Sequence, residues 1–399
     1  MKKIILLGGS TQQIFAIQKA KDLGLYTILC DYLPDNPGKK YADIYYNVST
    51  TNKDEILKIA LKNKIDGILA YASDPAALTA AYVATKMDLP TNPYESVEIL
   101  SKKDKFREFL KNNGFNCPEF NVFSNSDEFI QFMESANYPL IIKPTDSSGS
   151  KGVKIINEYN YQMLIQYFNN IINISREKKV IVEKFLKFDE ESVVGGDIFV
   201  KDGKIAHLGL VNSHHSKKTD GLIPIGNSYP LVNSYIDKES ISKRLEKIIN
   251  ILNIRNGPFN VELNFCNGAP YLIELGPRNG GNLIPLFLNS IFGVDLVEST
   301  VKNCIGDCSY NVNNLFERNF LCSYVLHTNR NGIFKKLNEN FKFKNNIINS
   351  FVYKKAGDKI LKFDGADKAI GIIFIRLNSM REIIDFFENE FDIVELVKN

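Results

Sequence analysis

The sequence YPLIIKPTDSSGSKGVKII at residues 138–156 places a segment of small, flexible residues between two apolar runs. The first run, Leu140–Ile142, is typical of a buried strand, and Lys143 follows it directly. A loop of serine and glycine brings backbone N–H groups close to an anion, because no side chain blocks the approach. Lys143 adds a positive charge beside the same anion. The stretch therefore predicts either a hairpin flap over a nucleotide's phosphates or a plain surface hairpin. The flap would consist of Ser147, Ser148, Gly149, Ser150, Lys151, Gly152 and Val153.

The composition is that of an ordinary globular chain. Its 399 residues allow two or three domains, and 44% of them are hydrophobic and 24% charged. The net charge of +3 is too small to indicate a nucleic-acid partner or a membrane surface. The first apolar run stops at Gly8, which is too early for a signal peptide. The six cysteines form no CxxC pair, so we expect free thiols in a reducing cytoplasm rather than a zinc site.

The first hundred residues alternate between strand and helix patterns. This alternation predicts a Rossmann-like domain at 1–100, with a parallel sheet and crossover helices. Gly8 and Gly9 follow the first strand, but Gln12 and Gln13 stand where a dinucleotide fingerprint requires a further glycine. Asp31, at the end of the second strand, is only a weak sign of a ribose contact. Because the fingerprint is incomplete, we prefer a role other than NAD binding for this domain. The strands are expected at 3–7, 26–30 and 67–70, and the helices at 14–23, 55–62 and 76–86.

The rest of the chain divides into two further parts. Residues 101–310 predict a mixed domain of two subdomains with a split near 188, and residues 311–399 predict a small α+β domain. The fold class is therefore α/β and α+β. Helices are expected at 101–113, 284–306 and 379–389, and a strand at 369–377.

A second candidate site follows the apolar strand that begins at Val180. The strand runs through Glu183 into an exposed hinge, whose backbone groups could contact the edge of an adenine ring. Glu190, seven residues further on, could accept hydrogen bonds from ribose hydroxyls. A strand end with solvated acids is the alternative interpretation.

The hairpin at 259–275 carries the strongest signal. Apolar and polar residues alternate in both of its strands, around a turn at Asn267-Gly268. Only an odd loop keeps the apolar face whole, so we predict a three-residue loop that places Leu263 opposite Ile273 and Glu262 opposite Glu274. Directly opposed carboxylates repel each other unless a divalent cation lies between them, and hard oxygen ligands favour Mg²⁺ or Mn²⁺.

The segment after Glu274 supplies an arginine and space. Arg278 could clamp a transferring phosphoryl group. The glycines that follow it, Gly280 and Gly281, leave room for a substrate.

In this order, these motifs resemble the ATP-grasp superfamily, in its carboxylate–amine ligase branch that includes carbamoyl-phosphate-synthetase-like proteins. The resemblance covers nearly the whole chain, and it implies an ATP-grasp fold between a pre-ATP-grasp domain and a small C-terminal domain. It implies ATP with two Mg²⁺ ions held by Glu262 and Glu274, and it assigns the γ-phosphate and acyl phosphate to Arg278. It assigns the other phosphate contacts to Lys105, Lys143 and the flap. It assigns the contacts with adenine to Glu183, Lys184, Phe185 and Leu186, and the contact with the ribose to Glu190.

One position departs from the family pattern. Many relatives carry asparagine two residues after the second glutamate, as a further metal ligand, and this chain has Gly276 there. Asn279 or a water molecule would have to take that place.

Two further segments are candidate substrate contacts. Asp74 follows a strand of the first domain and would hold an ammonium or hydroxyl group, or else only start a helix. His214 and His215, in the run NSHHSKK with Lys217 and Lys218, would form a lid over the phosphates, or else a solvated loop.

The resemblance implies phosphorylation of a carboxylate by ATP, followed by attack of an amine on the acyl phosphate. A bicarbonate-using carboxylase and a non-catalytic nucleotide-binding module are the alternatives. The expected partners are a small carboxylate and a small amine, and a homodimer is the default oligomer.

Overall fold

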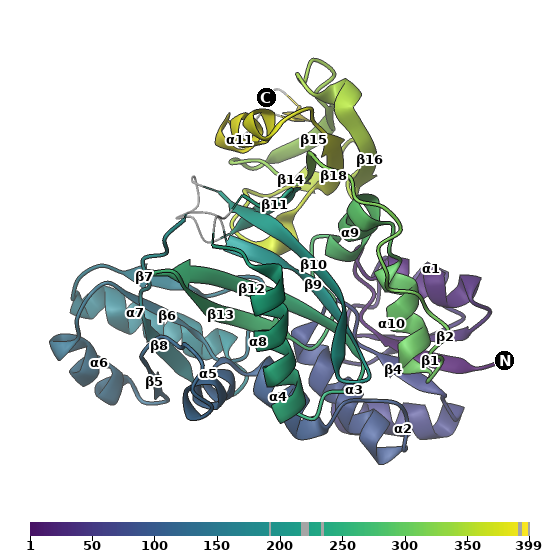
Figure 1. Ribbon diagram of the computed structural model, residues 1–399, viewed down its shortest axis with the longest axis horizontal. Coiled ribbons are helices and arrows are strands. Elements are labelled where there is room, and N and C mark those ends of the chain that lie inside the picture. Colours follow the sequence, from purple (N-terminus) through teal and green to yellow (C-terminus); the bar gives the residue numbers. More distant parts are fainter. Residues whose placement is uncertain (191–192, 217–222, 233–234, 390–392, 398–399) are drawn as a thin grey trace.

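The computed structural model describes residues 1–190, 193–216, 223–232, 235–389 and 393–397 (Figure 1). The N-terminal unit has a parallel sheet of order β3-β2-β1-β4, as the strand–helix rhythm predicts. Its first strand, KIILL, is almost wholly buried, which is typical of a parallel sheet covered by helices on both faces. The strands are β1 (Lys3–Leu7), β2 (Tyr26–Asp31), β3 (Ile44–Asn47) and β4 (Gly67–Leu69), and the helices are α1 (Ile14–Asp22), α2 (Lys53–Asn63) and α3 (Asp74–Lys86).

Two helices connect this unit to the next, of which the second confirms the helix predicted at 101–113 and the first was not predicted. Helix α4 spans Tyr94–Ser101 and α5 spans Lys103–Asn112. Between them Lys102 has an extended backbone, with φ −120° and ψ 119°. This break turns α5, so that Phe106 and Leu110 enter the core that lies under the large sheet.

The next unit is a small antiparallel sheet of order β5-β8-β6-β7. Strands β6 and β7 are neighbours and flank the segment 145–153, so the predicted hairpin flap is confirmed as a hairpin. Helices α6 and α7 bury apolar residues against this sheet. The elements are β5 (Phe120–Phe123), α6 (Ser126–Ser135), β6 (Leu140–Pro144), β7 (Lys154–Ile156), α7 (Tyr161–Ile174) and β8 (Val180–Lys184).

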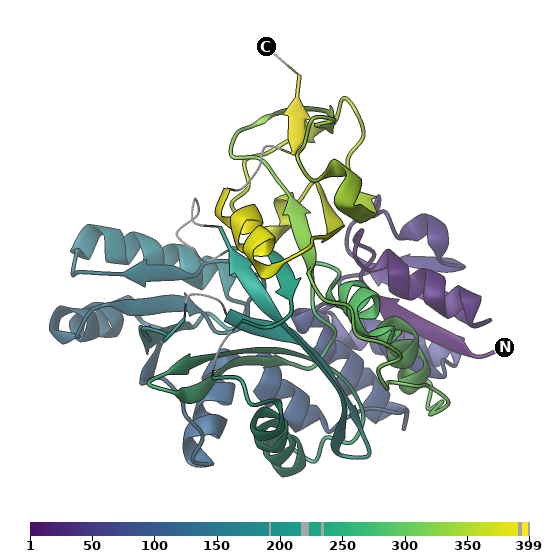
Figure 2. The same cartoon turned by 45° about the horizontal axis from the view of Figure 1, so that its top comes forward.

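The large sheet has the order β13-β12-β9-β10-β11-β14-β18-β16. Its last three strands come from the C-terminal third, and β14 pairs directly with β11 (Figure 2). The expected domain boundary at 310 is therefore crossed by one continuous sheet. The strands are β9 (Val193–Lys201), β10 (Lys204–His215), β11 (Pro224–Tyr229), β12 (Gly257–Cys266), β13 (Ala269–Gly276), β14 (Leu321–Leu326), β16 (Ile347–Val352) and β18 (Gly371–Arg376).

The predicted helix at 284–306 is two helices, α9 (Ile284–Phe292) and α10 (Leu296–Cys304). Gly293 ends α9 with a left-handed φ of 71°, and the Asp295 side chain caps α10. Helix α10 packs against the N-terminal sheet and so joins the two units. The remaining elements are α8 (Lys238–Ile251), β15 (Gly332–Leu337), β17 (Lys359–Ile360), α11 (Met380–Asn389) and β19 (Val394–Leu396). Among the described residues, no helix has the length and apolar character needed to cross a bilayer.

The β12–β13 hairpin confirms the predicted glutamate pair, but its turn and its register near the turn differ from those predicted. Glu262 lies opposite Glu274, and Val261 lies opposite Leu275. The predicted three-residue loop is wrong, because Cys266 pairs with Ala269 around a two-residue turn. The predicted pairing of Leu263 with Ile273 is also wrong, because Leu263 pairs with Leu272 and the register shifts between Glu262 and Leu263. A β-bulge at Ile273 thus makes the change of register that the longer loop was expected to make.

Candidate active site

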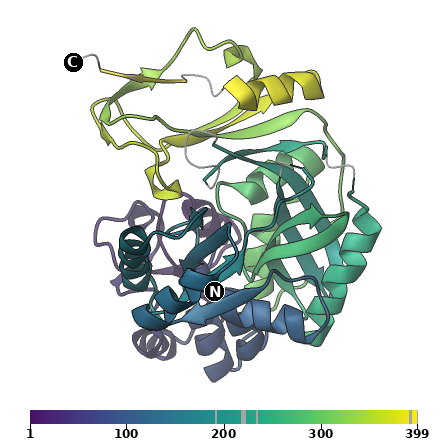
Figure 3. The ribbon, with the colours of Figure 1, turned by 90° about the vertical axis from the view of Figure 1, so that its left-hand side faces the viewer.

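The candidate site lies where the flap, the hairpin and the N-terminal unit meet. Figure 3 shows the small sheet, the large sheet and the N-terminal unit gathered together, with the C-terminal elements above them. A cavity of about 560 Å³ lies at this junction. It is lined by the predicted residues Asp74, Ser148, Gly149, Ser150, Glu262, Glu274, Arg278 and Gly281. The flap and the hairpin, which are more than a hundred residues apart in the sequence, therefore face one space.

Glu262 and Glu274 project from paired positions of β12 and β13. Burial raises the pKa of Glu262, and the negative charge of Glu274 raises it further. Such a pair of hard oxygen donors fits Mg²⁺, which binds through one or two carboxylates and completes its shell with phosphates and water. The donor set therefore agrees with a metal site for a nucleotide's phosphates.

Arg278 lies beside this pair and is held mainly by Asp74. Its Nε and Nη2 donate to the two oxygens of Asp74, both at 2.7 Å, and Nη2 also lies 3.2 Å from an oxygen of Glu274. Arg278 is only 8% exposed, and although burial opposes its charge, these carboxylates raise its pKa. Asp74 thus brings the N-terminal unit into the site through a two-point ion pair.

Gly276 provides the space for that ion pair. A Cβ at position 276 would lie 3.0 Å from Oδ1 of Asp74. Asn279, which the family pattern left as a possible substitute ligand, is fully buried and does not line the cavity. Its amide faces Asp197 without a hydrogen bond of ordinary geometry. Asp74, rather than Asn279, therefore occupies the space beside Gly276.

Asp197 of β9 fixes the segment after Arg278, and no sequence motif identified it. Both its carboxylate oxygens accept from the N–H of Gly280, at 2.8 and 2.9 Å. A Cβ on Gly280 would lie 2.7 Å from Asp197, so glycine is required for this close approach. Burial raises the pKa of Asp197 to about 6, against the effect of its hydrogen bonds. Gly280 is thus a structural residue, whereas Gly281 lines the cavity.

Lys143 forms a buried triad with Glu183 and Arg107. The carboxylate of Glu183 accepts from Lys143 Nζ at 2.6 Å and from Arg107 Nε at 2.9 Å. Burial raises the pKa of Glu183, but the two cations outweigh burial and lower it to about 2. Burial lowers the pKa of Lys143 to about 8, although Glu183 opposes this. The Glu183 side chain therefore anchors Lys143, and its predicted contact with adenine stays a prediction.

Arg107 is a second residue that sequence reasoning missed. Its Nη2 donates to the carbonyl of Ile273 at 2.9 Å, so the bulged residue of β13 has a partner outside the sheet. The available signal was an arginine between Phe106 and Leu110, on the buried side of α5. A charge at such a position indicates a buried partner.

The structure places Lys103 rather than Lys105 at the flap. Lys103 Nζ donates to the carbonyl of Ser147. Its positive charge partly offsets the rise in the pKa of Glu262 and contributes to the lowered pKa of Lys143. Lys105 points instead to Glu98, at 2.5 Å. The predicted phosphate contact at Lys105 stays a prediction, and Lys103, two residues earlier in α5, is the lysine that contacts the flap.

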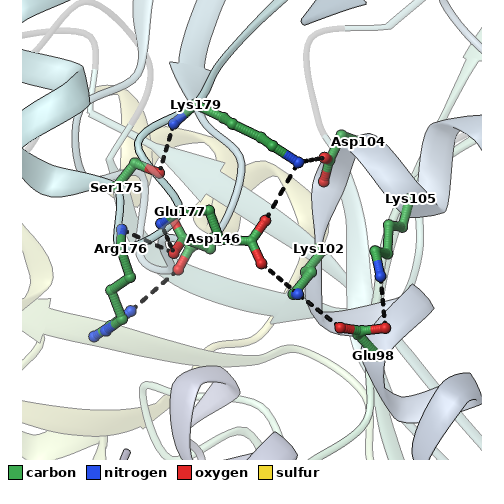
Figure 4. A network of polar contacts seen from close by, with 9 residues as sticks. All are labelled: Glu98, Lys102, Asp104, Lys105, Asp146, Ser175, Arg176, Glu177 and Lys179. Carbon is green, nitrogen blue, oxygen red and sulfur yellow. Dashed lines mark hydrogen bonds and ion pairs between the residues drawn. The ribbon is translucent and has the colours of Figure 1, made fainter. Parts of the chain in front are cut away.

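A network of charges holds the base of the flap (Figure 4). Asp146, immediately before the flap, accepts from the backbone N–H groups of Arg176 and Glu177 at 2.9 and 3.2 Å. Lys102 bridges Glu177 and Glu98, which links the flap's base to α4. The flap thus leaves a fixed base, and Ser150, Gly149 and Gly152 turn it through left-handed backbone angles.

The predicted hinge lines a separate cavity of about 610 Å³. Lys184, Phe185 and Leu186 line it, together with Tyr271 of the hairpin. The backbone N–H of Lys184 donates to the carbonyl of Glu119, and that of Phe185 donates to the carbonyl of Pro139. The hinge is therefore fixed to the small sheet. Glu190 lies beyond this cavity, and its carbonyl accepts from Asn264 at 3.4 Å.

The predicted histidine lid is not formed by the histidines. His214 stacks on Phe387 of α11 at 3.6 Å, its Nε2 lies 2.7 Å from Ser228, and burial lowers its pKa to about 3. His215 ends β10, and burial lowers its pKa to about 4. His214 thus packs where β10 meets α11, and Ser213 of the same strand lines the active-site cavity. Lys217 and Lys218 lie outside the described residues.

Residues 108–282 match the family model of the ATP-grasp domain. The carbamoyl phosphate synthase large chain of Thermotoga petrophila is 25% identical over 394 residues, which cover 93% of this chain and 34% of that one. The match spans between 28% and 58% of the length of the curated relatives.

Two solved structures share the fold over the full chain. The L-amino acid ligase from Bacillus licheniformis has a TM-score of 0.79 at 20% identity, covering 100% of this chain and 99% of that one. Phosphoribosylglycinamide synthetase from Anaerococcus prevotii has a TM-score of 0.73 at 22% identity, covering 100% of each chain. The chain therefore has the ATP-grasp fold, and its residues 108–282 match the ATP-grasp domain.

Proposed function

We propose that this chain is an ATP-dependent carboxylate–amine ligase. The observation that carries the proposal is the shared cavity, in which Glu262, Glu274 and Arg278 lie under the flap. Paired carboxylates, an arginine and a glycine-rich flap are the parts that phosphoryl transfer needs, because that chemistry depends on positioning and charge neutralisation.

In the proposed reaction, a carboxylate oxygen of the substrate attacks the γ-phosphorus of ATP, and ADP leaves. The nitrogen of an amine then attacks the carbonyl carbon of the acyl phosphate, and phosphate and a proton leave as the C–N bond forms. Both steps place negative charge on phosphoryl oxygens, which Arg278 is positioned to neutralise.

The nucleotide would lie between the two sheets. Lys143 and Lys103 would contact its phosphates, the flap would cover them, and the segment 184–186 would contact adenine. Glu262 and Glu274 would hold Mg²⁺, which supplies charge neutralisation to the phosphates when bound. Asp74 would set the orientation of Arg278 until a phosphate competes for it.

The test is ADP release with Mg²⁺ and ATP across a panel of carboxylates and amines, with bicarbonate as a separate arm. Glu274→Gln removes a carboxylate of the site, whereas Glu239→Gln, at a side chain 76% exposed on α8, is the matched control. We expect release that requires one carboxylate–amine pair, persists in Glu239→Gln and falls at least a hundredfold in Glu274→Gln.

Release with bicarbonate and one acceptor alone would favour a carboxylase. Nucleotide binding without release above the Glu274→Gln level, across the whole panel, would instead identify a binding module and overturn the proposal.

A further inference from the structure

A second cavity of about 580 Å³ lies over the β1–α1 turn of the N-terminal unit. It shares Ser10, Thr11 and Leu33 with the active-site cavity, and it shares Tyr353, Asp367 and Ala369 of the C-terminal third with it as well. The two cavities are therefore adjoining parts of one space, and a substrate could reach from the turn toward Arg278.

The turn has the position of a phosphate site, but three of its backbone N–H groups already have acceptors. Gly8 N donates to the carbonyl of Cys30 at 2.9 Å, Gly9 N donates to Asp31 Oδ2 at 2.8 Å, and Ser10 N donates to Gln13 Oε1 at 2.9 Å. A phosphate bound at such a turn depends on backbone N–H groups that point at it. Here these three N–H groups already have acceptors from within the chain.

Gln13 closes the turn from inside. Its Nε2 donates to the carbonyls of Leu7 and Tyr71, at 3.2 and 2.9 Å, and its side chain lies within 2.3 Å of where a Cβ on Gly8 would be. The side chain is only 7% exposed. Gln13 thus fills the concave side of the turn, where a phosphate would have to sit.

The charges of the second cavity also disfavour a phosphate. Its charged lining residues are Asp31, Asp367 and Lys354. Asp31 is buried at the end of β2 and directly contacts the turn. A phosphate dianion beside this carboxylate would be repelled, with little solvent to screen the repulsion.

The same lining suits a molecule with one charge of each sign. Lys354 lines only the second cavity, whereas Asp367 lines both. A carboxylate held by Lys354 would therefore leave an ammonium group near Asp367, on the side of the active-site cavity. Tyr353, which also lines both cavities, has a buried hydroxyl with no hydrogen-bond partner among the described residues, so it is available to such a ligand.

We propose that the second cavity binds an unphosphorylated amino acid, with its carboxylate toward Lys354 and its amine toward the active site. Its assignment as the amine substrate rests on the ligase function proposed above. The binding claim itself concerns only the ligand class: a zwitterion without phosphate.

The test is direct binding by calorimetry in the presence of Mg²⁺ and ADP, so that no turnover is needed. The probes are the free amino acids, and two matched pairs that differ by one phosphate: serine with O-phosphoserine, and ethanolamine with O-phosphoethanolamine. We expect at least one amino acid to bind, and each phosphorylated probe to bind at least tenfold more weakly than its partner or not at all. Lys354→Met should weaken the bound amino acid at least tenfold but leave the corresponding decarboxylated amine within threefold.

A gain-of-function variant tests the turn itself. Asp31→Asn with Gln13→Ala removes the charge and the side chain that closes the turn, and inorganic phosphate should then bind where the wild type shows no heat. Circular dichroism establishes that the variant is folded, and the matched probe pairs on wild type stand without it. Tighter binding of either phosphorylated probe, or no binding by any free amino acid, would overturn the proposal. Amino-acid binding without ADP release under any condition would contradict the ligase and leave this site in place.

Discussion

At the scale of single residues, Asp74 has the most consequences for the site. It comes from the N-terminal unit, yet it provides two of the hydrogen bonds of Arg278, which lies more than two hundred residues later. The sequence predicts that Asp74 starts a helix or touches substrate, and the structure has it at the first position of α3. Its pairing with Arg278 could not be predicted, because it depends on how two separate sheets pack.

Asp74→Ala should lower the free energy of unfolding by about 3 kcal/mol, the lower end for breaking a buried pair, because Glu274 still lies beside Arg278. Urea unfolding of the apo protein measures this change. Asp22→Ala, at an exposed position of α1, is the control and should change stability by less than about 0.5 kcal/mol. Equal effects of the two substitutions would show that the ion pair contributes no stability.

Gly276 and Asp74 should be energetically coupled. Gly276→Ala places a Cβ 3.0 Å from Oδ1 of Asp74, so it should destabilise the wild type but cost less in the Asp74→Ala background. A double-mutant cycle in urea should give a coupling of about 1 kcal/mol. Strict additivity would mean that Gly276 is not there to make room for Asp74.

Lys143 should take up a proton when a nucleotide binds at alkaline pH. Its pKa is lowered to about 8 by burial, so the free protein loses this charge above pH 8, whereas bound phosphates favour the charged form. Nucleotide affinity should therefore fall by up to about tenfold per pH unit above pH 8. Calorimetry at pH 8.5 in two buffers of different ionisation enthalpy measures the proton uptake. The uptake should disappear in Lys143→Arg, and a wild type without uptake would contradict the assignment.

At the scale of elements, the hairpin shows what pattern reasoning can and cannot reach. Alternation predicts that Glu262 faces Glu274, because only one parity keeps the apolar residues on the core side. The loop length could not be predicted, because a bulge at Ile273 changes parity as effectively as a longer loop. Strand β1 was predictable to the residue from its apolar run, whereas β3 was not predicted, because its half-buried IYYN lacks such a run.

The flap gives a matched pair of glycine substitutions. Gly149 and Gly152 both have left-handed φ angles, 65° and 79°. A Cβ on Gly149 meets only Ala366 at 4.0 Å, whereas one on Gly152 meets Ile174 and Pro144 at 3.0 and 3.1 Å. Gly152→Ala should therefore weaken nucleotide binding more than Gly149→Ala, by a further factor of about five, which corresponds to about 1 kcal/mol. Equal dissociation constants would show that the base of the flap adapts freely.

At the scale of the whole molecule, the C-terminal third contributes three strands, β14, β18 and β16, to the large sheet. The composition of residues 311–399 predicts a small α+β unit, but nothing in the sequence states which sheet its strands join. Pairing of β14 with β11 decides this, and the core beneath it combines Phe287 and Ile291 of α9 with Phe374 and Ile375 of β18.

A chain ending at residue 310 should therefore fail to fold alone. Truncation leaves β11 as an open edge and exposes the apolar residues of α9, which predicts aggregation. Soluble yield and circular dichroism of the 1–310 fragment measure this, with a 1–397 chain as the control. A soluble 1–310 fragment with a cooperative unfolding transition would restore the independent C-terminal domain.

Arg107 joins the two halves of the nucleotide cleft, since it bonds to Glu183 of the small sheet and to Ile273 of the large one. A translation of one sheet away from the other would break one of these bonds in the interior. The small sheet can keep both hydrogen bonds if it rotates about Arg107 as a hinge, with the flap farthest from the hinge. The segments nearest Arg107 would then move least, and the tip of the flap would travel farthest as a nucleotide enters and leaves.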